Sequence, residues 1–558
     1  MPMLIHGLHL NNIKGDIFGG VVAAVIAVPL ALAFGVASGA GAEAGLYGAI
    51  FVGFFAALFG GTPAQASGPT GPMTVVFAGL LVEMSSHPQL IFTTVVLGGV
   101  GLIVLGFLGI GRYISLMPYP VISGFMSGIG AIIIILQIGP LLGHAAKAGG
   151  VIPNVMGIAE FVTQPLMHAV ILAGIALIVM YLTPQPIGRI VPPPLLALLV
   201  CTPAASWFFP EAPVIGAVPS GFPPFLFPMM ELEFLPIVIK GACVLALLGA
   251  IDSLLTSLVC DNMTRTQHDS NRELIGQGIG NIVAGFFGGL PGAGATMRSV
   301  ANIRSGGRTP ISGALMGLVL LATLFWLGPL AEKIPLAVLA GILLKVGVDI
   351  IDWRFLRHVW EAPRADVGIM VVVFLMTVAV DLVTAVATGV VLASLLFVKE
   401  MADLQLANMK VITEVHEESP LTPEEASVME RNAGKIVLIH VDGPMSFGSA
   451  KNMVRRLETI SGLPTFISCV LDLSDVPVID GTAALAIDDM LRIVRAHKQH
   501  LFFVGMQPHV TEAFEGFGVL GHIPPGHRYA ERLDALRHAA EAAGSTHPED
   551  IALSPDEK

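Results

Sequence analysis

The 558-residue chain is 54% hydrophobic and 13% charged, about half the charged fraction of soluble domains, so most of it is not an ordinary soluble protein. Residues 1–400 carry only 18 of the 41 acidic and 16 of the 29 basic residues, whereas residues 401–558 carry the rest and have a soluble composition. Lys and Arg do not cluster as a nucleic-acid-binding surface requires. The 4 cysteines and 16 histidines show no zinc or redox spacing, and no nucleophile–base pattern indicates an enzyme.

Apolar runs separated by short polar loops follow one another from residue 17 to residue 398. Most have about the ~20 residues that cross a bilayer as a helix. Two of them are too short to span alone, and each follows a Gly/Pro-rich stretch. Counting these two, we expect fourteen segments, at 17–37, 44–60, 72–84, 90–110, 119–138, 166–183, 193–209, 236–259, 273–289, 296–303, 309–329, 336–352, 366–380 and 382–398. The sequence therefore predicts an all-α polytopic membrane domain over residues 1–399.

The loops between these segments differ in basic residues. With a cytoplasmic N-terminus, ten Lys and Arg fall on the cytoplasmic side and two, Lys147 and Lys333, on the other. Cytoplasmic loops carry such an excess of basic residues. We therefore expect a bacterial inner membrane protein with both its N-terminus and its C-terminal domain in the cytoplasm.

The two short segments occupy the third and tenth places among the fourteen. Each follows a break, Ser67–Pro72 in one case and Pro291–Thr296 in the other. The chain then divides into two sets of seven, and because seven is odd the second set enters the membrane inverted. Paired broken segments indicate the binding site of a transporter, so we expect two half-helices that meet near the middle of the membrane.

A helix that begins inside a membrane directs unpaired N–H groups and partial positive charge at whatever lies before it. Two such helices facing each other form an anion pocket without lysine. Thr70 and Thr296 stand at the two helix starts. Their hydroxyls can cap these helices and also donate to a bound anion, which makes both threonines candidate anion-binding residues.

Asp252 is a lone carboxylate in an otherwise apolar span, and such residues are usually functional. Thr256 lies one turn further along the same face. With the carbonyl of Gly294, these oxygens suit a hard cation such as sodium, and Asp252 could alternatively carry a proton. Arg298 begins the second half-helix, where it could add positive potential to the anion site, pair with Asp252, or extend towards the cytoplasm.

The C-terminal part changes pattern. Residues 400–433 are polar and acidic and are interpreted as a linker. Buried strands and helices then alternate, which is typical of a small α/β domain with a partly parallel sheet, here over 434–543. We expect strands at 435–441, 466–473 and 501–504, helices at 450–460, 483–495, 510–517 and 531–543, and a disordered tail at 544–558.

Several motifs are distinctive: Asp16–Gly20, Gly68–Pro72, Pro118–Gly128 and Asn281–Gly289 in the membrane part, and Leu471–Thr482 in the tail. They resemble the sulfate permease family of anion transporters, which carry a C-terminal STAS domain. The resemblance covers nearly the whole chain. It implies a 7+7 inverted repeat, a core domain moving against a gate domain, and homodimers in the lipid bilayer.

Further motifs refine the resemblance, at Ala37–Leu46, Gly53–Pro63, Glu273–Gly278, Gly292–Met297 and Ile334–Gly341. Within the family they are most similar to the cyanobacterial sodium-dependent bicarbonate carriers. That resemblance implies sodium at Asp252, Thr256, Gly294 and Thr296. It also implies bicarbonate near Thr70 and between the half-helix ends at Ala295 and Thr296.

Three positions bear on how far the resemblance extends. Leu30 stands where many family members have Gln or Glu, so a proton route there is absent. Arg298 is a residue of many sulfate, oxalate and chloride carriers, whereas the bicarbonate subgroup has a small residue at that place. In the tail, Thr482 falls at the phospho-acceptor position of bacterial relatives and is a candidate regulatory residue.

The function expected from these residues is sodium-coupled bicarbonate uptake, with no cofactor apart from the coupling ion. A proton-coupled or exchanging transporter of sulfate or a dicarboxylate is the alternative, and dependence of uptake on sodium separates the two. A membrane-anchored STAS signalling protein is a third reading. The paired broken segments argue against it, because a mere anchor needs no polar site within the membrane.

Overall fold

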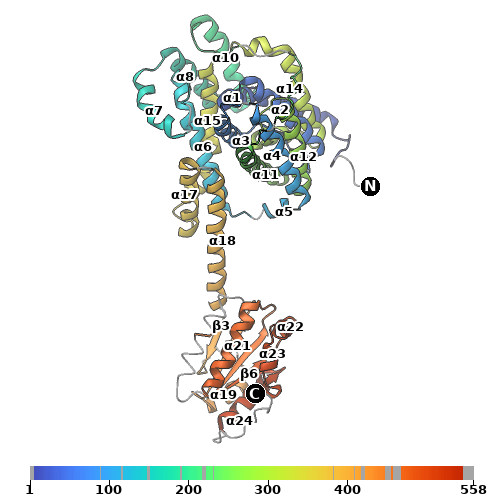
Figure 1. Ribbon diagram of the computed structural model, residues 1–558, viewed down its shortest axis with the longest axis vertical. Coiled ribbons are helices and arrows are strands. Elements are labelled where there is room, and N and C mark those ends of the chain that lie inside the picture. The colour runs from blue at the N-terminus through green and yellow to red at the C-terminus, as the bar shows by residue number, and fades with distance from the viewer. Residues whose placement is uncertain are drawn as a thin grey trace. The chain divides into compact units, whose positions relative to one another are not determined.

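The structure is a computed structural model. It describes residues 6–87, 89–114, 117–147, 151–188, 191–216, 221–229, 231–380, 382–407, 409–415, 421–445, 454–455 and 467–544. The chain divides into two compact units, Met1–Ala393 and Ser394–Lys558. Each unit is described below by itself (Figure 1).

The first unit is helical, and each of the fourteen expected segments lies on one of its helices. These are α1 (Ile13–Ser38), α2 (Ala42–Phe59), α3 (Gly71–Glu83), α4 (Leu90–Phe107), α6 (Tyr119–Leu141), α8 (Met167–Leu182), α10 (Pro193–Phe208), α11 (Leu235–Thr264), α12 (Ser270–Phe286), α13 (Thr296–Arg304), α14 (Pro310–Ala331), α15 (Leu336–Ile350), α17 (Arg364–Ala379) and α18 (Leu382–Ala407). Four further helices were not expected: α5 (Gly111–Ile114), α7 (Val151–Thr163), α9 (Gln185–Gly188) and α16 (Trp353–Arg357).

Length and hydropathy mark this unit as membrane-spanning. Six helices of the described residues are long and apolar enough to cross a bilayer, or seven if α7 and α8, bent by 110° at a short break, count as one span. α3, α10 and the described part of α14 are apolar but shorter than 18 residues. Large apolar side chains such as Phe107, Trp207 and Trp326 are exposed on the outside, as expected for a surface that faces lipid.

The helices pack in a reciprocal pattern. α4, fourth in the first set of seven, contacts α11 and α12, the first two helices of the second set, and α14 contacts α1 and α2 in the same way. α4 and α12 approach each other closely at Gly99, which has no side chain. A Cβ at this position would lie only 2.6 Å from the carbonyl oxygen of Gly278. This exchange between the sets is what two equivalent repeats produce.

The second unit is an α/β domain with a five-stranded sheet of order β3-β4-β5-β6-β7. The strands are β3 (Met409–Ile412), β4 (Ile436–Asp442), β5 (Ser468–Asp475), β6 (His500–Val504) and β7 (Arg528–Tyr529). β3 pairs with β4 antiparallel, and the remaining pairs are parallel. Its helices are α19 (Pro423–Arg431), α21 (Gly481–Ala496), α22 (Pro508–Gly516), α23 (Val519–His522), the 3₁₀ turn η1 (Pro525–His527) and α24 (Arg532–Gly544).

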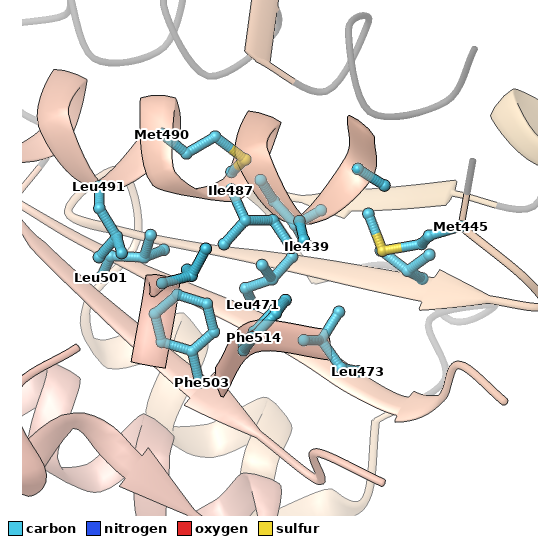
Figure 2. Close-up of a cluster of buried hydrophobic side chains, with 14 of the residues drawn as sticks. Ile439, Met445, Leu471, Leu473, Ile487, Met490, Leu491, Leu501, Phe503 and Phe514 are labelled. Carbon is cyan, nitrogen blue, oxygen red and sulfur yellow. The ribbon is translucent and has the colours of Figure 1, made fainter. Parts of the chain in front are cut away.

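The strands alternate between two apolar layers, as the two-residue period of a strand requires. Ile439, Leu471 and Phe503 face one layer, where they meet Ile487 of α21 and Phe514 of α22 (Figure 2). The intervening residues Leu438, Val470 and Phe502 face the other layer, which also contains Leu536 and Ala539 of α24. The sheet is therefore covered on both faces.

The interpretation of residues 400–433 as a linker is wrong. They include the end of α18, then β3, and then α19, whose start is fixed by a capping box between Thr422 and Glu425. Ile412 and Met429 lie in the apolar core of the domain. The acidic residues around these short apolar stretches hid them from the sequence pattern. The expected helix at 450–460 and the tail at 544–558 lie outside the described residues, except Val454, Arg455 and Gly544.

A buried ionic network closes the sheet against α24. Asp472 accepts hydrogen bonds from His440 Nδ1 (2.9 Å) and Ser474 Oγ (2.6 Å), and Arg532 Nη1 lies 3.2 Å from it. Arg532 Nε also reaches Glu425 at 3.1 Å. Burial alone would raise the pKa of Asp472, but the hydrogen bonds and the Arg532 charge outweigh it and lower that pKa.

We expect Asp472→Asn to destabilise this domain by about 1.5–3 kcal/mol, because it removes the charged acceptor of the hydrogen bonds from His440 and Ser474 and leaves Arg532 paired with Glu425 alone in this network. In the wild type, the stability from Asp472 is present above the unfolded-state pKa of about 3.9 and is lost as the pH falls through the lower folded-state pKa. Hydrogen exchange of the sheet amides in the full-length chain, followed against pH, measures both effects. The exposed Asp489→Asn is the control, and equal protection in both variants would contradict the role of the network.

Candidate functional site

The two breaks in the membrane unit lie against each other. Residues of the first break form β1 (Ser67–Gly68), residues of the second form β2 (Ala293–Gly294), and the two pair antiparallel, with Ser67 opposite Gly294. The amide of Ala295 extends the pairing by donating to the carbonyl of Ala66 at 3.0 Å. Each break thus supplies hydrogen-bond partners for the buried backbone of the other.

A half-helix starts directly after each of these strands. Thr70 is the N-cap residue of α3, and Ala295 is the N-cap residue of α13, in which Thr296 is the first helical residue. Neither N-cap side chain accepts a hydrogen bond from its own helix. Of the roles considered for the Thr70 hydroxyl, capping of α3 does not occur, because that hydroxyl donates to Asp252.

α11 joins the two half-helices through three consecutive polar contacts. Thr70 Oγ1 donates to Asp252 Oδ2 at 2.7 Å. One turn further on, Thr256 Oγ1 donates to the carbonyl of Gly294 at 3.0 Å and lies 2.8 Å from Thr296 Oγ1. These side chains are buried except that of Thr296, which is more exposed. The carboxylate, two hydroxyls and the carbonyl form a cluster of hard oxygen donors beside two helix N-termini.

Arg298 lies inside the protein and does not extend towards the cytoplasm. Its side chain is 2% exposed, and its Nη2 donates to the carbonyl of Pro69 at 2.6 Å. Gly68, with φ of +145°, allows this approach, since a Cβ there would lie 2.7 Å from Arg298 Nη1. No ion pair between Arg298 and Asp252 occurs among the described residues, although the two charges influence each other through space. Arg298 therefore fastens the first break to the second half-helix.

Glu273 is a residue of this region that the sequence reasoning missed. Its side chain is 1% exposed and accepts from the amides of Gly61 and Thr62, both at 2.9 Å. It also accepts from Gln65 Nε2 (2.7 Å) and Gln277 Nε2 (2.8 Å). Four donors on one carboxylate hold the chain that leads into β1. The available signal was the polar pair Glu273 and Gln277, four residues apart and therefore on one face of α12.

The structure thus brings together seven of the residues singled out in the sequence: Thr70, Asp252, Thr256, Gly294, Ala295, Thr296 and Arg298. Thr482 belongs to the other unit. It is exposed in the first turn of α21, where Asp480 caps the amide of Ala483 at 2.7 Å.

Comparison with known proteins identifies the family. Residues 13–373 match the model of the sulfate permease family. The chain belongs to the sulfate permease family. Residues 427–532 match the STAS domain, so this member of the family has the C-terminal STAS domain that its motifs indicate. It is a membrane transporter of that family rather than an enzyme.

Individual relatives cover most of the chain. Bicarbonate transporter BicA of Synechocystis sp. is 42% identical over 550 residues, or 97% of each chain. The solved transmembrane domain of a cyanobacterium bicarbonate transporter BicA is 47% identical, with a TM-score of 0.65, and covers 69% of this chain and 100% of that one. The murine anion transporter Slc26a9 shares the fold at a TM-score of 0.82 and 19% identity, over 96% and 92% of the two chains.

We expect Glu273→Gln to destabilise the membrane unit, because the amide turns a donor towards groups that are themselves donors. Losing two charge-assisted hydrogen bonds corresponds to about 3 kcal/mol or more. Thermal unfolding of the purified protein in detergent measures the change. The control is Glu361→Gln on an exposed residue, and a midpoint lowered equally by both variants would contradict the assigned role of Glu273.

Proposed function

We propose that this chain is a sodium-coupled importer of bicarbonate in the inner membrane of a bacterium. Its N-terminus and STAS domain would lie in the cytoplasm, as the ten-to-two distribution of basic residues favours, and it would act as a homodimer. The full-length similarity to proteins named bicarbonate transporter supports the choice of anion. The structural observation that carries the proposal is the bridge from Thr70 through Asp252 and Thr256 to Thr296.

The anion would be bound between the two half-helix N-termini. The N-cap residues Thr70 and Ala295 are buried, Thr296 is exposed, and neither helix has a side-chain cap. The first amides of both helices are therefore donors for a carboxylate-like anion. The partial positive charges of the two helix ends add together at this point. Thr70, Ala295 and Thr296 border the site, and Arg298 contributes a full positive charge from behind the first break.

The sodium ion is the second substrate, and the oxygens of Asp252, Thr256, Gly294 and Thr296 would bind it. The cluster contains carboxylate, hydroxyl and carbonyl oxygens, which hard cations prefer. A negative Asp252 opposes an anion nearby, and sodium removes that opposition. Each ion therefore raises the affinity for the other, which is the coupling that symport requires.

Two alternatives remain as outcomes of the test. Asp252 could take up a proton in place of sodium, since burial disfavours a charged carboxylate and a single hydroxyl donor, that of Thr70, offsets this only in part. Arg298 could favour sulfate or a dicarboxylate, because a fixed positive charge suits a dianion better than a monoanion.

In the STAS domain, phosphorylation of Thr482 would regulate transport, and its exposure in the first turn of α21 leaves it accessible to a kinase.

We expect the purified protein in liposomes to take up labelled bicarbonate faster with an inward sodium gradient than with an equal potassium gradient. Uptake that ignores sodium but follows an inward proton gradient would assign Asp252 to protons. Uptake that responds to neither ion would contradict the coupling. Labelled sulfate, tested under the same gradients, decides the anion, and sodium-dependent uptake with sulfate preferred would overturn bicarbonate while keeping the mechanism.

Asp252→Asn should abolish sodium-driven uptake while leaving the protein folded, because the amide keeps the shape and one oxygen but removes the charge. A charge-assisted contact corresponds to about 1.5–3 kcal/mol, so sodium affinity should fall about 10- to 100-fold. The matched control, Glu211→Gln, removes one carboxylate from an exposed loop and should leave uptake unchanged. An unaltered sodium dependence in Asp252→Asn would exclude Asp252 as the coupling residue.

Arg298→Gly tests the role of the buried arginine. If Arg298 selects the anion, this variant should raise the Michaelis constant for a dianion more than that for bicarbonate. If its main effect is to hold Pro69, uptake of both anions should fall together with thermal stability. Initial rates of uptake and the unfolding midpoint, measured on the same preparation, separate these results.

A further inference from the structure

Helix α7 (Val151–Thr163) is bent by 110° from α8 (Met167–Leu182) at a short break between them. α8 lies on one of the segments expected to span the membrane, and spanning helices tilt by about 20° on average from the bilayer normal. Because a bend of 110° is close to a right angle, α7 runs nearly in the plane of the membrane. It is therefore not an extension of the span, and it lies near the bilayer surface at which α8 begins.

The face of α7 that packs against α6 is partly polar. Its buried residues are Asn154, Gly157 and Phe161, which are three and four positions apart. The side chain of Asn154 accepts from the amide of Lys147 at 2.9 Å and donates to the carbonyl of the same residue at 2.7 Å. Phe161 packs close to α6, since a Cβ on Gly139 would lie 3.2 Å from its ring. The helix thus turns an amide side chain towards the protein.

The opposite face of α7 is apolar and exposed. Ile152, Val155, Met156 and Val162 are 59%, 46%, 79% and 59% exposed. A helix beside water has the reverse pattern, with charged and polar residues outside and apolar residues towards the core. Glu160 is the single charged residue of α7. A helix that keeps its polar amide inside and its large apolar side chains outside is suited to hydrocarbon surroundings.

One ion pair marks the margin of this apolar face. Glu160 lies four residues after Met156 and therefore beside it on the helix, and its carboxylate pairs with Lys147 at 2.6 Å. Val155 and Val162, seven residues apart, lie together at the opposite margin. Charged groups stay at the level of the lipid headgroups because the hydrocarbon region excludes them. The Glu160 margin is therefore the water side of α7, and the valine margin is the lipid side.

Two observations favour lipid over a second copy of the chain as the partner of this face. The apolar surface continues without a break onto α8, where Met167, Ile171 and Ile178 are exposed in the same way. The area is also small. A helix of 13 residues is about 20 Å long and about 10 Å wide, so one face covers about 200 Å², whereas each partner in a stable protein interface contributes about 800 Å².

We propose that α7 is an in-plane membrane helix whose face of Ile152, Val155, Met156 and Val162 inserts among the lipid acyl chains just below the headgroups. Its partner is the lipid surface itself. Because α7 packs against α6 and α17, its insertion fixes the depth of these two helices in the bilayer. The proposal concerns a surface away from the half-helices and does not depend on which ion is carried.

Spin labels on single cysteines test the proposal in the full-length protein in nanodiscs of phosphatidylcholine. The background is Cys243→Ser, because Cys243 is exposed and the other three native cysteines are buried. Val162→Cys and Val155→Cys report the lipid-side margin, and Met156→Cys reports the water-side margin. The references are Ile178→Cys on α8 and Glu512→Cys in the STAS domain, both at exposed positions. Collision rates with oxygen, which is enriched in lipid, and with a polar nickel complex are measured for each label.

We expect the labels at Val155 and Val162 to collide with oxygen as often as the label at Ile178. They should collide with the nickel complex about tenfold less often than the label at Glu512, since keeping a polar solute out of hydrocarbon corresponds to at least about 1.4 kcal/mol. The label at Met156 should lie between these limits. Unfolding midpoints of the labelled variants serve as the control for folding, and Val155→Cys repeats the test if Val162→Cys is unstable.

Nickel collision rates at Val155 and Val162 equal to that at Glu512 would show that the face meets water, and would overturn the proposal. Immobile labels that neither reagent reaches would show that protein covers the face, and dipolar broadening between labels on two copies would identify that protein as a second chain. Either result would contradict a lipid partner. The collision rates are measured without transport, so they stand whether or not bicarbonate is the ion carried.

Discussion

The antiparallel pairing of β1 with β2 is the constraint on which the membrane unit depends. Each strand has two residues, too few to be stable alone, and each interrupts the chain before a short helix. Buried backbone groups need partners, and a lipid environment supplies none. The two breaks meet this need only by facing each other, so each half of the chain completes the other. Thr70 and Thr296 are neighbours of α11 for that reason.

The charges around this pairing are not balanced. Asp252 and Glu273 carry two negative charges, and Arg298 carries one positive charge, all of them buried. Glu273 is surrounded by four donors and Arg298 is held by Pro69, whereas Asp252 has a single hydroxyl donor. The least-satisfied charge is therefore the one that lies beside the two half-helix starts. This difference in environment distinguishes the structural carboxylate from the one suited to binding an ion.

The sequence pattern predicted the helices well because apolar runs of fixed length have few alternatives in a bilayer. It missed α7, since Asn154 and Glu160 interrupt the apolar character of that stretch, and it missed β3 and α19 because short elements among acidic residues resemble a linker. The paired breaks located Thr70 and Thr296 through position alone. The direction of Arg298 and the partners of Glu273 could not be predicted, because they lie across contacts between residues more than two hundred positions apart.

The uncapped starts of α3 and α13 have a consequence for the energetics of the whole fold. A side-chain cap on a helix is typically worth about 1 kcal/mol, and here the chain forgoes it twice, with Thr70 committed to Asp252. The anion proposed to bind here would accept from these amides and act as a movable capping group. Its binding free energy would enter the folding equilibrium by mass action, so the thermal stability of the protein would depend on the bound anion. The melting temperature of the purified protein in detergent, measured with different anions, would therefore show which anion binds, although a detergent solution has no two compartments between which transport could be measured.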